Sequence, residues 1–119
     1  MKRAAKHLLA GTVLAGLCGA ALAQDQISAE ADHVFWCASA FFWLAGDASD
    51  VGDAKEAELY DGWAGELTET GIGLLREQKL TDPDKISSII DHYDNTVLDE
   101  LGTANARYPV EGCQDLVKS

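Results

Sequence analysis

Cys37 and Cys113 are two of the three cysteines in the chain, and they are best suited to form a disulfide bond with each other. The third cysteine, Cys18, lies in an N-terminal segment that we expect to be removed. Two cysteines in an exported protein pair most simply with each other, because exported compartments are oxidising. Catalytic thiol–disulfide exchange favours two cysteines separated by two residues, and the sequence contains no such pair. We therefore predict a structural disulfide that closes a loop of roughly 75 residues and stabilises the fold by about 4–5 kcal/mol.

Other residues with metal-binding or catalytic chemistry form only partial motifs. His33 and Cys37 are spaced like two metal ligands on one helical turn, but a disulfide at Cys37 would remove one ligand. Residues 47–58 carry Asp, Gly and Glu where a calcium loop needs them, whereas other ligand positions hold unsuitable residues. His92 follows Asp91, and catalytic triads use these two residue types, but the sequence shows no nucleophile motif to complete a triad. The sequence therefore predicts no catalytic residue, no metal ligand and no cofactor.

The first 23 residues have the three parts of a secretory signal peptide. Three basic residues precede an apolar run over 8–21, and Ala21 and Ala23 provide the small residues that a signal peptidase reads. We expect cleavage before Gln24, a mature chain that forms a single domain over 24–119, and a periplasmic location. The apolar run is shorter than the about 20 residues that a membrane span requires, so we expect no stable membrane insertion after cleavage.

The charge of the chain is strongly negative, with 20 acidic residues against nine basic ones. Removal of residues 1–23 takes away three of the basic residues and none of the acidic ones, which leaves a formal charge of −14. Such a charge repels nucleic acid and anionic lipid, so neither is an expected partner. It is compatible with a cationic partner, with loosely bound divalent cations, or simply with solubility.

The most apolar part of the mature chain is the segment from His33 to Ala45, which contains all three phenylalanines and two of the three tryptophans. As a helix it would be apolar on nearly all sides. Such a helix is either covered by other helices or presents an aromatic surface to a partner. For the second alternative, the candidate partner-binding residues are Phe35, Trp36, Phe42 and Trp43. The partner would be another periplasmic protein or a second copy of the chain.

Capping residues and apolar periodicity predict three helices and a final helical turn. Ser28 is expected to cap the first helix, which would end near Ala45 with Gly46 as its stop. The second helix would run from Asp53 to about Lys79, with a kink over 70–73 and close helix packing at Gly62 and Gly65. The third would begin at Asp82-Pro83 and end before the break at 107–109, and a short turn over 111–117 would bring Cys113 back to the first helix. The predicted fold is all-α: a small three-helix antiparallel bundle with a short C-terminal helical turn, stapled by one disulfide.

Two short motifs carry a resemblance to known proteins: Cys37 followed by small and aromatic residues, and the stretch Tyr-Pro-Val-Glu-Gly-Cys-Gln-Asp-Leu over 108–116. In these motifs the chain resembles uncharacterised small exported bacterial proteins with a signal peptide, helices and two cysteines. A more distant likeness is to the periplasmic acid-stress chaperones, which are helical two-cysteine proteins.

Three functions therefore remain as hypotheses. The first is a non-enzymatic periplasmic protein that binds another protein or serves as an accessory or structural factor. The second is an acid-responsive chaperone, because many carboxylates would titrate near pH 4 and loosen the packing. The third is a small-ligand or hydrolytic site among the aromatic residues of the bundle.

Overall fold

The computed structural model describes residues 27–117; the predicted signal peptide over 1–23 and its cleavage site lie outside the described residues. Within this range all regular secondary structure is helical and no strand is present, so the predicted all-α class is confirmed. The element order is α2 (Ala29–Asp50), α3 (Ala54–Glu77), α4 (Pro83–Glu100), the short 3-10 helix η1 (Val110–Gly112) and α5 (Cys113–Val117).

The three long helices begin where the capping residues predicted. The side chains of Ser28, Asp53 and Asp82 each accept a hydrogen bond from a backbone N–H in the first turn of α2, α3 and α4 respectively. These bonds satisfy N–H groups that have no carbonyl partner within the helix. Pro83 occupies the first position of α4, where its fixed φ angle suits the helix and its missing N–H costs nothing.

The predicted end of the first helix is wrong, because α2 continues through Gly46 to Asp50. Ala45 and Ala48 are buried, and this packing extends the helix beyond an exposed glycine that opposes it only weakly. The chain turns instead at Gly52, whose φ of 83° favours glycine. The segment compared with a calcium loop therefore begins as helix.

The predicted end of the third helix is also wrong: α4 ends at Glu100, several residues before the expected break at 107–109. Leu101 adopts an extended conformation and Gly102 has a φ of 80°, which turns the chain away from the helix axis. The Thr103 hydroxyl donates to the backbone carbonyl of Glu100 over 2.7 Å, which satisfies a carbonyl at the helix end. Residues 101–109 therefore form a connecting segment between α4 and η1.

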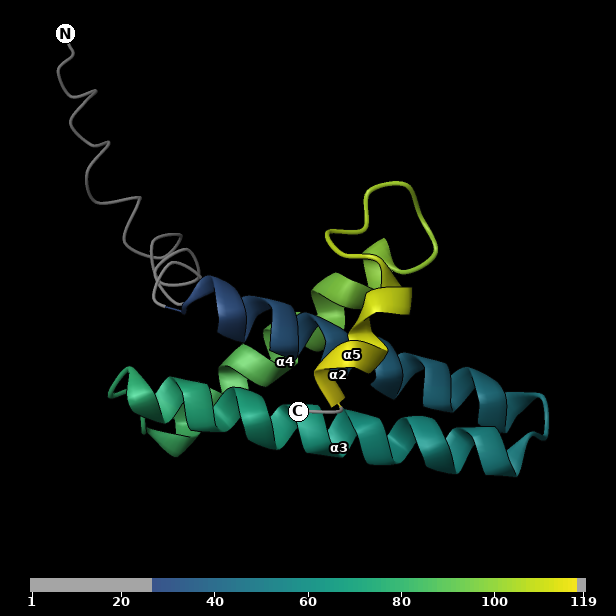
Figure 1. The fold of residues 1–119 in the computed structure, drawn as a ribbon, viewed down its shortest axis with the longest axis horizontal. Helices are drawn as coiled ribbons and strands as arrows, with labels where there is room; N and C mark the ends of the chain where they lie inside the picture. The colour runs from purple at the N-terminus through teal and green to yellow at the C-terminus, as the bar shows by residue number, and fades with distance from the viewer. Residues whose placement is uncertain (1–26, 118–119) are drawn as a thin grey trace, which may run out of the picture.

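The helices are arranged around α2, as Figure 1 shows. α3 runs back along α2 as the second arm of a helical hairpin, α4 crosses behind α2, and α5 crosses its middle. α3 and α4 each pack mainly on α2 and make little direct contact with each other. The core is accordingly dominated by α2, and the largest fully buried side chains are Phe35, Trp36, Leu67, Leu75, Tyr93 and Val97 together with the two cysteines.

Close packing against a glycine of α3 occurs at Gly71 rather than at the predicted Gly62 and Gly65. A Cβ atom at Gly71 would lie 2.7–2.9 Å from three carbons of the Phe35 ring, whereas a Cβ at Gly62 or Gly65 would meet no atom within 4 Å. The absence of a side chain at Gly71 therefore makes room for Phe35 between α2 and α3. The kink predicted over 70–73 is not seen: α3 is helical throughout this stretch and runs without a break in Figure 1.

The predicted disulfide between Cys37 and Cys113 is confirmed. The Cα atoms are 5.4 Å apart, within the usual range for a disulfide, and both residues are fully buried. The bond joins the middle of α2 to the first residue of α5, across 76 positions of sequence. The C-terminal segment is thereby held covalently against α2.

Candidate functional site

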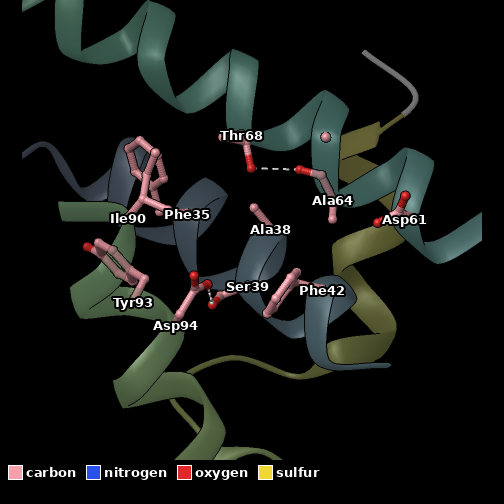
Figure 2. Close-up of a pocket in the computed structure, with 11 residues that line it drawn as sticks. Phe35, Ala38, Ser39, Phe42, Asp61, Ala64, Thr68, Ile90, Tyr93 and Asp94 are labelled. Atoms are coloured by element: carbon pink, nitrogen blue, oxygen red, sulfur yellow. Dashed lines mark hydrogen bonds between the residues drawn. The ribbon is translucent and has the colours of Figure 1, made fainter. Parts of the chain in front are cut away.

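A groove lies between α3 and α4, with α2 as its floor (Figure 2). Its volume is about 260 Å³. It exists because α3 and α4 diverge on this side of α2. α2 contributes Phe35, Ala38, Ser39 and Phe42 to the lining, and the walls come from residues 61–68 of α3 and 90–94 of α4. We refer to it below as the α3/α4 groove.

Aromatic rings form much of the groove. Phe35 is only 2 % exposed, and its ring stacks on that of Tyr93 with a centroid separation of 5.6 Å. Phe42 is 47 % exposed and meets Trp43 edge-on at 5.1 Å. The groove therefore combines a fixed aromatic floor with one large apolar side chain that is half open to water. An exposed phenylalanine beside a concave apolar surface is a feature of sites that bind a partner or a ligand.

A polar contact joins α2 to α4 at the edge of the groove. The Ser39 hydroxyl donates to Oδ1 of Asp94, and the Trp43 indole N–H donates to the Asp94 backbone carbonyl over 2.8 Å. Ser39 is buried, so this bond satisfies a hydroxyl that would otherwise be costly to bury. The two bonds fix the position of α4 on α2 and keep a carboxylate at the groove edge. Asp61 on α3 supplies a second, exposed carboxylate to the lining.

A second polar cluster holds the segment that follows α4 against α2. Asp32 accepts hydrogen bonds from the hydroxyls of Tyr93 (2.5 Å) and Tyr108 (2.6 Å). Arg107 bridges two carboxylates, with N–O distances of 3.1 Å to both Asp32 and Glu100. We call these five residues the carboxylate cluster. Because its members come from α2, α4 and the segment after α4, the cluster ties these three parts of the chain together.

The carboxylate cluster shifts the pKa values of its members. Burial and the hydrogen bond to Asp32 raise the pKa of Tyr108 to about 12, and the same causes raise the pKa of Tyr93 further. Burial alone would raise the pKa of Glu100, but hydrogen bonds from the Arg107 side chain and backbone and from Trp36 lower it overall. At neutral pH both tyrosines are therefore neutral donors and Glu100 is an ionised acceptor.

The four predicted partner-binding residues separate into two groups. Phe35 and Trp36 are 2 % and 0 % exposed, so the first alternative, coverage within the chain, holds for them. Trp36 donates its indole N–H to Glu100 over 3.0 Å and packs edge-on against Tyr108. Phe42 is exposed, and Trp43 is partly buried against the core. A surface made of all four residues is therefore excluded, and Phe42 is the one with the largest open area.

The two histidines in the described part of the chain, His33 and His92, each contact a tyrosine ring. The His33 ring stacks on Tyr108 with a centroid separation of 4.1 Å, and Cys37 is in the disulfide, so this pair cannot bind a metal as two ligands. His92 meets the Tyr93 ring edge-on, and its Nε2 is buried without a hydrogen-bond partner. Between residues 27 and 117, no group of three or more His, Cys, Asp or Glu side chains is arranged to hold a metal ion.

Sequence reasoning did not find the α3/α4 groove, nor the role of Asp61 and Asp94 in it. One signal was available: Ser39 is one of two polar residues in an otherwise apolar segment, and such a residue requires a hydrogen-bond partner when buried. That signal indicates a polar contact but not which helix supplies the partner.

Comparisons with known proteins add no assignment. No protein-family model matches the chain, and neither does any curated protein or any solved structure.

None of the helices described between residues 27 and 117 is long and apolar enough to cross a membrane.

Proposed function

We propose that this protein is an exported, non-enzymatic helical protein of the periplasm that acts by binding another protein, as an accessory or structural factor. The observation that carries the proposal is Phe42, a large aromatic side chain that is 47 % exposed beside the apolar α3/α4 groove. Aromatic residues, phenylalanine included, are enriched at protein–protein interfaces relative to the rest of the surface. The export of the protein is inferred from its signal-like N-terminus and from the paired cysteines.

A comparison of two matched alanine variants tests this proposal. Immobilised wild-type protein, Phe42→Ala and Leu59→Ala would be incubated with periplasmic extract of the source bacterium, and retained proteins would be identified by mass spectrometry. Leu59 is the control because it is 50 % exposed but lies in a separate hollow on α3, with Gly62 and Trp63. We expect a partner retained by wild type and Leu59→Ala and lost with Phe42→Ala. An identical set of proteins on all three would reject the proposal, as would retention of none.

The carboxylate cluster supports a second candidate, an acid-responsive chaperone. Asp32 and Glu100 accept the hydrogen bonds that hold Tyr93, Tyr108, Arg107 and Trp36 in place. Protonation of Glu100 in acid would weaken its bonds to Arg107 and Trp36, loosen the attachment of residues 101–112 to α2 and expose the aromatic residues beneath.

Light scattering of an aggregating client enzyme measures this second activity. The protein would be added to the client at pH 3 and at pH 7, with bovine serum albumin as the control protein. Suppressed aggregation at pH 3 and not at pH 7 is the expected result. Equal scattering with and without the protein at pH 3 would rule out the chaperone function.

A further inference from the structure

We propose that the α3/α4 groove binds a cationic amphipathic helix of a partner protein, with one bulky apolar side chain of that helix seated in the groove. The inference rests on the proposed protein-binding function and names its surface and the chemistry of its partner. It depends on three observations: the divergence of α3 and α4, the size of the groove, and the charge at its edges.

The arrangement of the helices leaves a position for another helix. α3 and α4 both pack on α2 and make little contact with each other. Between them α2 presents Phe42, which is 47 % exposed, above the buried side chains of Phe35 and Ser39. The lining there includes the small residues Ala38, Ala64 and Gly65, and a Cβ atom at Gly65 would meet no other atom within 4 Å. An amphipathic helix laid across the mouth of this groove would cover Phe42 and seat one apolar side chain between α3 and α4.

The size of the groove favours a single side chain over a larger ligand. Its volume of about 260 Å³ is below the roughly 300–1,000 Å³ of pockets that enclose drug-sized molecules. A pocket of this size, with Phe35 as its floor and Phe42 beside it, matches the anchor-in-pocket arrangement of binding hot spots.

The charge of the groove selects a basic partner. Asp94 on α4 and Asp61 on α3 line its two walls, and no basic side chain is part of the described lining (Figure 2). The whole chain carries a formal charge of −11 before any cleavage, so the surrounding field has the same sign. Lysine or arginine side chains that flank the apolar anchor would therefore be attracted, whereas an acidic partner or a second copy of this chain would be repelled.

A synthetic peptide provides a defined probe. It would be a fluorescein-labelled amphipathic helix of about 18 residues, composed of leucine and lysine, that is, five helical turns. Binding would be followed by fluorescence anisotropy. Control peptides would carry glutamate in place of lysine, or the same leucine and lysine residues in an order without helical amphipathicity. We expect the lysine helix to bind, with an affinity that falls as salt is added, and both controls to bind at least about tenfold more weakly.

Two glycine variants test whether the peptide occupies the groove. Gly65→Leu places a side chain inside it, and Gly62→Leu places the same side chain in the separate hollow on α3. Both positions have open space at Cβ and lie within a helix, so both variants should fold, which far-UV circular dichroism would check. We expect Gly65→Leu to weaken binding about tenfold or more and Gly62→Leu to leave it within about twofold of wild type.

A second pair of variants tests the charge. Asp61→Asn and Glu58→Gln remove one negative charge each from α3, but only Asp61 lines the groove. Asp61→Asn should weaken binding of the lysine peptide and reduce its salt dependence more than Glu58→Gln does. Equal effects of the two variants would overturn the assignment of the basic side chains to this groove.

The remaining outcomes separate this inference from the proposed function. Equal binding to Gly65→Leu and wild type, or no preference for the lysine helix, would overturn the groove as its site. In that case, if the wild-type protein still captures periplasmic partners that Phe42→Ala does not, the proposed protein-binding function is supported. Only the inference of a basic helix in the α3/α4 groove then fails. If size-exclusion chromatography with light scattering shows a dimer that Gly65→Leu dissociates, the occupant is a second copy and the inference fails. If neither the peptide nor any extract protein binds, both fail.

Discussion

The substitution Gly71→Ala is a direct test of the packing between α2 and α3. The added Cβ atom would lie 2.7–2.9 Å from three ring carbons of Phe35, well inside the 3.5–4.0 Å at which carbon atoms pack best. Phe35 is 2 % exposed and stacked on Tyr93, so its ring cannot move without disturbing the core. Overpacking of this kind costs about 1–3 kcal/mol. It acts against the roughly 1 kcal/mol by which alanine favours a helix over glycine.

The matched control is Gly62→Ala on the same helix. A Cβ at Gly62 meets no atom within 4 Å, so only the helix-forming advantage of alanine remains and this variant should be more stable than wild type. We expect the free energies of unfolding of the two variants to differ by about 1–3 kcal/mol. For a domain of this size that difference separates the melting temperatures by at least about 4 °C.

Urea and thermal denaturation followed by circular dichroism at 222 nm would measure these values. The double variant Phe35→Leu/Gly71→Ala provides a further test, because a smaller and more flexible side chain at position 35 leaves room for the new methyl group. Its destabilisation should be less than the sum of the two single effects. If Gly71→Ala stabilises the protein as much as Gly62→Ala does, the close approach of Phe35 to α3 is wrong.

Three further predictions concern the disulfide and the carboxylate cluster. Replacement of Cys37 and Cys113 by alanine should lower the free energy of unfolding in urea by up to about 4–5 kcal/mol, and a loss below about 1 kcal/mol would contradict the role of the disulfide. Because the pKa of Tyr108 is raised from 10.0 to about 12, its hydrogen bond contributes stability below pH 10 that is lost as pH rises toward 12. Tyr108→Phe should therefore flatten the alkaline fall in the urea midpoint, and an unchanged slope would argue against the contact. Because the pKa of Glu100 is below its ordinary value of 4.5, its ionised form contributes stability that is lost as pH falls below that value. Glu100→Gln should be less stable at pH 7 and lose less stability between pH 7 and pH 3, whereas a wild-type acid profile would refute the ion pair with Arg107.

The sequence predicted those features that depend on local chemistry. Ser28, Asp53 and Asp82 cap their helices through bonds within one turn, so neighbouring residues were enough to place them. The disulfide followed from the presence of two cysteines outside the predicted signal peptide. The all-α class followed from apolar spacing, which reflects the side of each helix that is buried.

The features that the sequence did not predict depend on contacts between distant residues. Gly46 was expected to end a helix, but buried alanines on either side of it continue α2. Gly71 was expected to bend a helix, but its effect is to admit Phe35 from another helix. The α3/α4 groove depends on the angle at which α4 crosses α2, and periodicity reveals the apolar face of a helix but not its crossing partner.

The disulfide also governs what happens when the backbone is cut. α3, α4 and the turns beside them all lie between Cys37 and Cys113, including the exposed residues 77–79 and 81–85. A protease that cleaves one peptide bond anywhere in this interval leaves two pieces that remain joined through sulfur. Such a nicked molecule would migrate as one band on a non-reducing gel and as two after treatment with dithiothreitol. A protein built in this way retains both halves of its helical scaffold after a single proteolytic event.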